Sequence, residues 1–108
     1  MAESFTVETV SRQELKKGLA DGTIILVDVR EPNEYATGHV KGALNISLDD
    51  LPTRVENVPD AEPVYVICQA GNRSSRGADL LIDLGYQAVS VDGGIQAWTE
   101  QGLPLDTE

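Results

Sequence analysis

Two nearly continuous apolar segments limit the folds open to this 108-residue chain more than any other feature. They run from Ile24 to Val29 and from Val64 to Cys68, and neither alternates apolar with polar positions as a half-exposed strand would. Strands that are apolar along their length are typical of a parallel sheet covered on both faces. The pattern therefore predicts two buried strands between layers of helices. Three further strands are expected at Val89 to Val91 and, more weakly, at Thr6-Val7 and Ala43 to Ile46, which makes five in all.

Helix signals lie between the expected strands. The clearest is a capping box, in which Ser11 is followed three residues later by Glu14. Ser74 or Ser75 can cap another helix, which ends at Gly85. Shorter helices are expected at residues 32–36, 48–55 and 94–100. Alternating strands and helices predict a three-layer α/β domain.

Length and charge exclude several classes of protein. A chain of 108 residues is expected to form a single domain over residues 1–108. Eighteen acidic and eight basic side chains give a formal net charge of -10, which argues against nucleic acid or an anionic membrane as a partner. The first residues have neither a basic start nor an apolar run, and no segment reaches membrane-spanning length. We therefore expect a cytoplasmic protein.

Cys68 is the only cysteine, and the chain has one histidine. An intramolecular disulfide needs a second cysteine and a zinc site needs several cysteine or histidine ligands, so neither is expected, and no metal or cofactor is predicted. Cys68 ends a strand of the expected parallel sheet, and open α/β sheets bind ligands beyond the carboxyl ends of their strands. The residue is therefore a candidate nucleophile.

The residues after Cys68 favour a reactive thiolate. The chain must turn from strand to helix within a few residues, and Gly71 and Asn72 tolerate the positive φ of such a turn. Such a turn predicts a nest of backbone N–H groups, and the following helix points the positive end of its dipole at the loop. Arg73 adds a cation suited to an oxyanion. We predict Cys68 and Arg73 as catalytic residues, and as substrate-binding residues Gln69, Ala70, Gly71, Asn72 and Ser74.

Two other interpretations compete at this loop. A free cysteine is often a small buried side chain without chemistry, and Cys68 would then simply end a core strand. Cysteine phosphatases place five residues between the cysteine and the arginine, whereas four lie between Cys68 and Arg73. The shorter loop favours sulfur over phosphate. An exposed thiolate could also be oxidised to a sulfenic acid, which would make peroxide sensing a secondary role.

Four ordered blocks of residues resemble those of single-domain rhodaneses, which are sulfurtransferases. The similarity extends from about Thr6 to Leu103, which we take as the core of the domain. The blocks are Asp28 to Glu31 with Glu34-Tyr35, Gly38 to Ala43 with Asn45-Ile46, Cys68 to Ser74, and Gly93 to Trp98. The resemblance implies a rhodanese-like fold, a five-stranded parallel sheet with helices on both faces.

The resemblance also implies an activity. Cys68 would take a sulfane sulfur from a small anionic donor such as thiosulfate, and its persulfide would pass that sulfur to cyanide or a thiol, possibly on a partner protein. Asp28 and Arg30 are expected to be structural residues near the site, His39 a packed histidine and Trp98 a core residue. The alternative is a non-enzymatic rhodanese-like module that carries sulfur or binds a protein.

Overall fold

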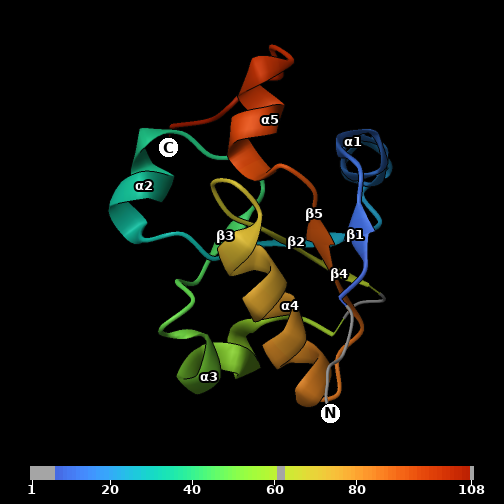
Figure 1. Ribbon diagram of the computed structural model, residues 1–108, viewed down its shortest axis with the longest axis vertical. Helices are drawn as coiled ribbons and strands as arrows, with labels where there is room; N and C mark the ends of the chain where they lie inside the picture. The colour runs from blue at the N-terminus through green and yellow to red at the C-terminus, as the bar shows by residue number, and fades with distance from the viewer. Residues whose placement is uncertain (1–6, 61–62, 108) are drawn as a thin grey trace.

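A computed structural model describes residues 7–60 and 63–107, and it contains one five-stranded sheet in which every pairing is parallel (Figure 1). The order across the sheet is β1-β5-β4-β2-β3, so β4 lies at its centre. The strands are β1 (Thr9–Val10), β2 (Ile25–Asp28), β3 (Leu44–Asn45), β4 (Val64–Ile67) and β5 (Ala88–Val91). The prediction of a five-stranded parallel sheet is confirmed.

Helices cover both faces of the sheet, as the three-layer prediction requires (Figure 1). They are α1 (Arg12–Asp21), α2 (Pro32–Thr37), α3 (Leu51–Arg54), α4 (Asn72–Asp83) and α5 (Gly94–Glu100), with a 3-10 turn at Val55–Asn57. Helix α4, with 12 residues, is the longest of them, and within the described part of the chain no helix is long and apolar enough to cross a membrane.

Two apolar clusters, one on each face, hold the layers together. On one face, Val27 and Val66 of the sheet pack with Leu51 of α3 and Leu81 of α4. On the other face, Leu26 and Ile67 pack with side chains of α1 and α5. Because successive residues of a strand point to opposite faces, β2 and β4 contribute to both clusters. Their nearly continuous apolar sequence is the direct consequence of this double burial.

Neighbouring residues cap both ends of α1. The Glu14 amide donates to Ser11 Oγ at 3.1 Å and the Ser11 amide donates to Glu14 Oε1 at 3.1 Å, so both halves of the expected capping box are present. Gly22 ends the helix in the left-handed conformation, with φ +68°. These two caps satisfy backbone groups that the helix itself leaves unpaired.

Most predicted elements agree with the structure to within one residue at each end, and three predictions differ from it by more. The expected strand at Thr6-Val7 is replaced by β1 at Thr9–Val10, Thr6 lying outside the described residues. The helix expected over residues 48–55 is only the four-residue α3, continued by the 3-10 turn. The cap predicted at Ser74 or Ser75 is wrong, because α4 already begins at Asn72.

The early start of α4 has a local cause. Gly71 has φ +117° and reverses the chain directly before the helix. Ser74 Oγ and Ser75 Oγ each donate to the Gly71 carbonyl oxygen at 3.0 Å, so these hydroxyls act as donors inside the first turn and cap no amide. Gly77 brings the same helix close to the sheet, since a Cβ there would lie 3.3 Å from Val29 and from Val66.

Candidate active site

Cys68 follows the last residue of β4 at the carboxyl edge of the sheet. Next to it, β2 ends at Asp28, which is the register partner of Ile67. The strand-end position predicted from the sequence is therefore confirmed. The cysteine itself is only 1% exposed and packs in the apolar cluster below α4, so the exposure that oxidation to a sulfenic acid needs is absent and a peroxide-sensing role loses its main support.

Burial leaves the sulfur with two polar neighbours. The Gly71 N–H donates to Cys68 Sγ at 3.0 Å, and the thiol can donate to Ser74 Oγ at 3.4 Å. Within residues 7–60 and 63–107, Gly71 is the only backbone amide that donates to this sulfur. Of the loop amides from which the sequence predicts a nest, this one donates to the cysteine sulfur itself, beside a hydroxyl.

Helix α5 fixes the first half of the loop. The amides of Ile95 and Gln96, in its first turn, donate to the carbonyl oxygens of Cys68 and Gln69, each at 2.9 Å. This approach requires Gly94, because a Cβ at that position would lie 2.3 Å from the Cys68 carbonyl oxygen. The loop is thus held at its start by α5 and at its end by Gly71 and α4.

Arg73 is bound to a carboxylate that the sequence did not identify as its partner. Its two terminal nitrogens donate to Glu34 of α2 at 2.7 and 2.9 Å, in a two-pronged ion pair whose side chains are 34% and 32% exposed. Hydrogen bonds from Arg73 lower the pKa of Glu34 from 4.5 to about 2, although its partial burial opposes the shift. The same bonds raise the pKa of Arg73. The cation at the loop is therefore already paired.

Asp28 and Arg30 form a second ion pair beside the loop, and it is completely buried. Arg30 Nη2 lies 2.8 Å from Asp28 Oδ2 and also donates to the Gly38 carbonyl at 2.8 Å. Its Nη1 lies 3.4 Å from Gln69 Oε1, which links the pair to the loop. A buried pair of this kind needs further hydrogen bonds to be tolerated, and these contacts supply them. The structure thus contains a buried ion pair at these two residues, and their structural role stays a prediction.

The remaining predicted residues divide by exposure. Gln69, Ala70 and Asn72 are exposed on the rim of the loop, whereas Ser74 is fully buried beneath it. Outside the loop, His39 is 3% exposed and stacks on Tyr35 with ring centroids 3.7 Å apart. Trp98 is 4% exposed in the apolar cluster on the α5 face. Both are packed residues, as predicted.

Two residues at the site were missed by the sequence analysis. Glu34 binds Arg73 across 39 positions of sequence, and no local pattern connects two residues so far apart. Ser90 lies in β5, 1% exposed, with its Oγ 2.7 Å from Ser74 Oγ. The sequence does contain a signal for Ser90, because it is a polar residue inside the apolar strand Ala88–Val91, at a position that should be buried.

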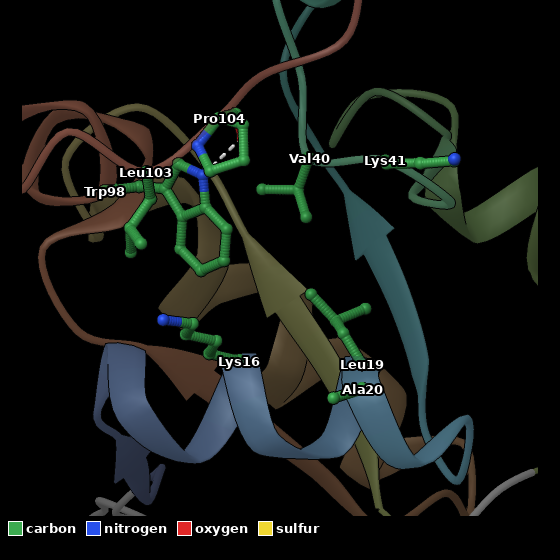
Figure 2. Close-up of a pocket in the computed structure, with 8 residues that line it drawn as sticks. All are labelled: Lys16, Leu19, Ala20, Val40, Lys41, Trp98, Leu103 and Pro104. Atoms are coloured by element: carbon green, nitrogen blue, oxygen red, sulfur yellow. Dashed lines mark hydrogen bonds between the residues drawn. The ribbon is translucent and has the colours of Figure 1, made fainter.

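An apolar cavity in the structure does not belong to the loop. A cavity of about 470 Å³ lies between α1, α5 and the segment after His39, where the Trp98 indole donates to the Pro104 carbonyl (Figure 2). Its lining residues are Lys16, Leu19, Ala20, Val40, Lys41, Trp98, Leu103 and Pro104. None of them lies between Cys68 and Ser74, so this cavity does not give access to the sulfur.

Comparison with known proteins gives the family of this fold and site. The family model for the rhodanese-like domain matches residues 11–101. The chain belongs to the rhodanese-like family. A curated relative, a sulfurtransferase from Allochromatium vinosum, is 34% identical over 101 residues, which are 92% of this chain and 94% of the relative.

Solved structures agree with this assignment. A rhodanese-related protein from Thermoplasma volcanium is 32% identical, with a TM-score of 0.86 over 94% of this chain and 99% of that protein. A Bacillus anthracis protein, CoADR-RHD, is 41% identical with a TM-score of 0.79, over 85% of this chain and 16% of that longer chain. The rhodanese-like unit therefore occurs both alone and as part of larger chains.

The close approach of α5 to the loop predicts the effect of Gly94→Ala. An alanine at position 94 would be strained by the φ of +59° and would also collide with the Cys68 carbonyl. An alanine at position 22 would have a similar φ of +68°, but its Cβ would have no other atom within 4 Å. The left-handed conformation costs roughly 1–2 kcal/mol in both variants. We expect Gly94→Ala to lose about 2 kcal/mol more stability than Gly22→Ala in urea unfolding. Equal losses would contradict the close approach.

The ion pair between Arg73 and Glu34 predicts a dependence of stability on pH. The folded-state pKa of Glu34, about 2, lies below its ordinary value of 4.5, so the pair stabilises the fold above pH 4.5 and loses this contribution as pH falls toward 2. Because both side chains are about one third exposed, we expect only about 1 kcal/mol. Between about pH 5 and about pH 2, the free energy of unfolding measured in urea should therefore fall by about 1 kcal/mol more in the wild type than in Glu34→Gln. Parallel curves would show that the pair adds nothing.

Proposed function

We propose that this chain is a sulfurtransferase that carries a sulfane sulfur on Cys68 as a persulfide. The observation that carries the proposal is the position of Cys68 Sγ, which lies at the carboxyl edge of the central strand with the Gly71 amide 3.0 Å away. An N–H donor at this distance stabilises negative charge on sulfur. Membership of the rhodanese-like family and the 34% identity to a sulfurtransferase support the same conclusion.

The proposed reaction has two steps. In the first, the Cys68 thiolate attacks the outer sulfur of thiosulfate, a new S–S bond forms at Cys68, the S–S bond of thiosulfate breaks, and sulfite leaves with the bonding electron pair. In the second, cyanide or a thiolate attacks the outer sulfur of the persulfide, and the Cys68 thiolate is released. The thiol acceptor can belong to a small molecule or to a partner protein. A cysteine that must stay reduced between cycles fits a cytoplasmic location.

Arg73 would bind the anionic donor, but only in competition with Glu34. Its two terminal nitrogens are both occupied by the Glu34 carboxylate, at 2.7 and 2.9 Å. Both side chains are partly exposed, and exchange of one anion for another at such a pair costs little. We therefore assign Arg73 to donor binding and Glu34 to holding the guanidinium in place between cycles.

The donor must also reach a sulfur that is 1% exposed. The loop residues Gln69, Ala70 and Asn72 are exposed, while the core residues around Cys68 are not. We infer that a donor reaches Sγ by displacing the loop, since opening the apolar core would cost far more free energy.

A second candidate is a non-enzymatic rhodanese-like module that binds a partner protein. The observations that favour it are the burial of Cys68 and the pairing of Arg73 with Glu34, since both groups lack the free contact that a small substrate needs. In a module of this kind Cys68 would only fill the core. The two candidates differ in whether thiosulfate can load sulfur onto Cys68.

Incubation with thiosulfate distinguishes the two candidates. We expect the intact mass of the protein to increase by one sulfur atom, and dithiothreitol to remove it. Cys68→Ser should not gain sulfur and should lose transfer to cyanide by on the order of a thousandfold, with little loss of stability because the change is nearly isosteric. Wild-type protein that stays at its original mass would favour the binding module.

The assignment of Arg73 predicts a selective kinetic effect. Arg73→Ala should raise the KM for thiosulfate by about tenfold, because a charge-assisted contact to the donor is lost, and should change the second step less. Arg76→Ala is the matched control, since Arg76 lies one turn further along α4 and is exposed. Steady-state rates measured with thiosulfate and cyanide give the KM for each substrate in both variants. An unchanged KM in Arg73→Ala would remove Arg73 from donor binding.

A further inference from the structure

Ser90 is a polar residue in a strand whose four residues are all buried. It lies in β5 between Val89 and Val91, and it is 1% exposed. A buried hydroxyl without a hydrogen-bond partner lowers stability by about 1–3 kcal/mol, so the partner of Ser90 explains how a serine is tolerated in this strand. The partner of Ser90 Oγ is Ser74 Oγ, at 2.7 Å. Ser74 in turn lies 3.4 Å from Cys68 Sγ.

The hydrogen-bonding capacity of Ser74 determines how the three side chains interact. Its hydroxyl has one proton to donate and two lone pairs to accept with. Three acceptors compete for that proton, the Ser90 oxygen at 2.7 Å, the Gly71 carbonyl oxygen at 3.0 Å and the Cys68 sulfur at 3.4 Å. While Cys68 is a thiol, its S–H and the Ser90 hydroxyl can both donate to the Ser74 oxygen, and the Ser74 proton then goes to Gly71.

Ionisation of Cys68 changes this arrangement. When the thiol proton leaves to solvent water, the sulfur becomes a pure acceptor, and the Ser74 hydroxyl can turn its proton toward it. The Gly71 carbonyl does not lose its partner, because Ser75 Oγ also donates to it at 3.0 Å. Ser90 can then donate to Ser74 Oγ, which completes a chain of hydrogen bonds from Ser90 through Ser74 to the thiolate.

We propose that Ser90 is a positioning residue, which acts through Ser74 to stabilise the Cys68 thiolate. A hydroxyl that accepts a hydrogen bond becomes a better donor, so the bond from Ser90 strengthens the bond from Ser74 to sulfur. It also holds the Ser74 oxygen in one place beneath the loop. The role rests on the proposed function, in which the thiolate attacks the donor in the first step and is the leaving group in the second.

Charged groups also lie on the elements that surround the loop. They are Arg73 of α4, Glu34 of α2, Asp28 at the end of β2 with Arg30 after it, and Asp92 between β5 and α5. None of them has a hydrogen bond to Ser90 among the described residues. Their contribution is therefore the same in wild type and in Ser90 variants, and a comparison of the two isolates the hydroxyl.

Titration of the thiolate by its ultraviolet absorbance tests the proposal. The absorbance of Cys68→Ser is subtracted at each pH, so the signal belongs to Cys68 alone and needs no reagent to reach the buried sulfur. We expect Ser90→Ala to lower the ratio of thiolate to thiol at a given pH by about three- to tenfold, and hence to move the titration to higher pH. Ser47→Ala, which removes a serine that is 5% exposed at a different site, should titrate as wild type does.

A second pair of variants separates the hydroxyl from packing. Threonine and valine have the same shape and differ by one hydroxyl, so Ser90→Thr should titrate close to wild type and Ser90→Val close to Ser90→Ala. If Ser90→Ala and Ser90→Val both titrate like wild type, the role of Ser90 is overturned. The titration uses no sulfur donor, so its result does not depend on whether thiosulfate loads Cys68. Failure of the proposed function is recognised separately, because the intact mass then shows no added sulfur after incubation with thiosulfate.

Discussion

The two hydrogen bonds from the first turn of α5 to the Cys68 loop are the contacts on which the site depends. They fix the carbonyl oxygens of Cys68 and Gln69, at 2.9 Å each, and so fix the plane of the peptide groups that follow. Gly94 makes the approach possible, and Gly71, with φ +117°, then turns the chain so that its amide meets the sulfur at 3.0 Å. These contacts between backbones therefore convert a strand end into a loop whose Gly71 amide faces the cysteine sulfur.

Charge at this loop is arranged in pairs. Arg30 is neutralised by Asp28 in the buried layer, and Arg73 by Glu34 nearer the surface. The positive charge that Arg73 brings to the loop is therefore largely compensated by Glu34. In the proposed function, stabilisation of a sulfur anion then depends mainly on neutral donors, the Gly71 amide and the Ser74 hydroxyl, which cost no free energy of ion desolvation.

The sequence predicted those features that depend on local or periodic patterns. Buried strands, the Ser11 capping box and the position of Cys68 at a strand end follow from apolar runs and cap residues, which act within a few positions. Features that join distant segments were missed. Glu34 meets Arg73 across 39 positions, and Ser90 meets Ser74 only because α4 packs across β5. The start of α4 differs from the prediction because Gly71, and not a serine side chain, occupies the N-cap position.

The burial of Cys68 has a consequence for a sulfur carrier. An exposed persulfide would react with any thiol or oxidant that collides with it, and the carried sulfur would be lost. A sulfur that is 1% exposed reacts only with a molecule that displaces the loop, and displacement requires breaking the contacts made by Arg73 with Glu34 or by α5 with the loop. An anion that binds Arg73 competes for the first of these contacts. In the proposed function, selection of the donor and access to the sulfur are therefore the same event.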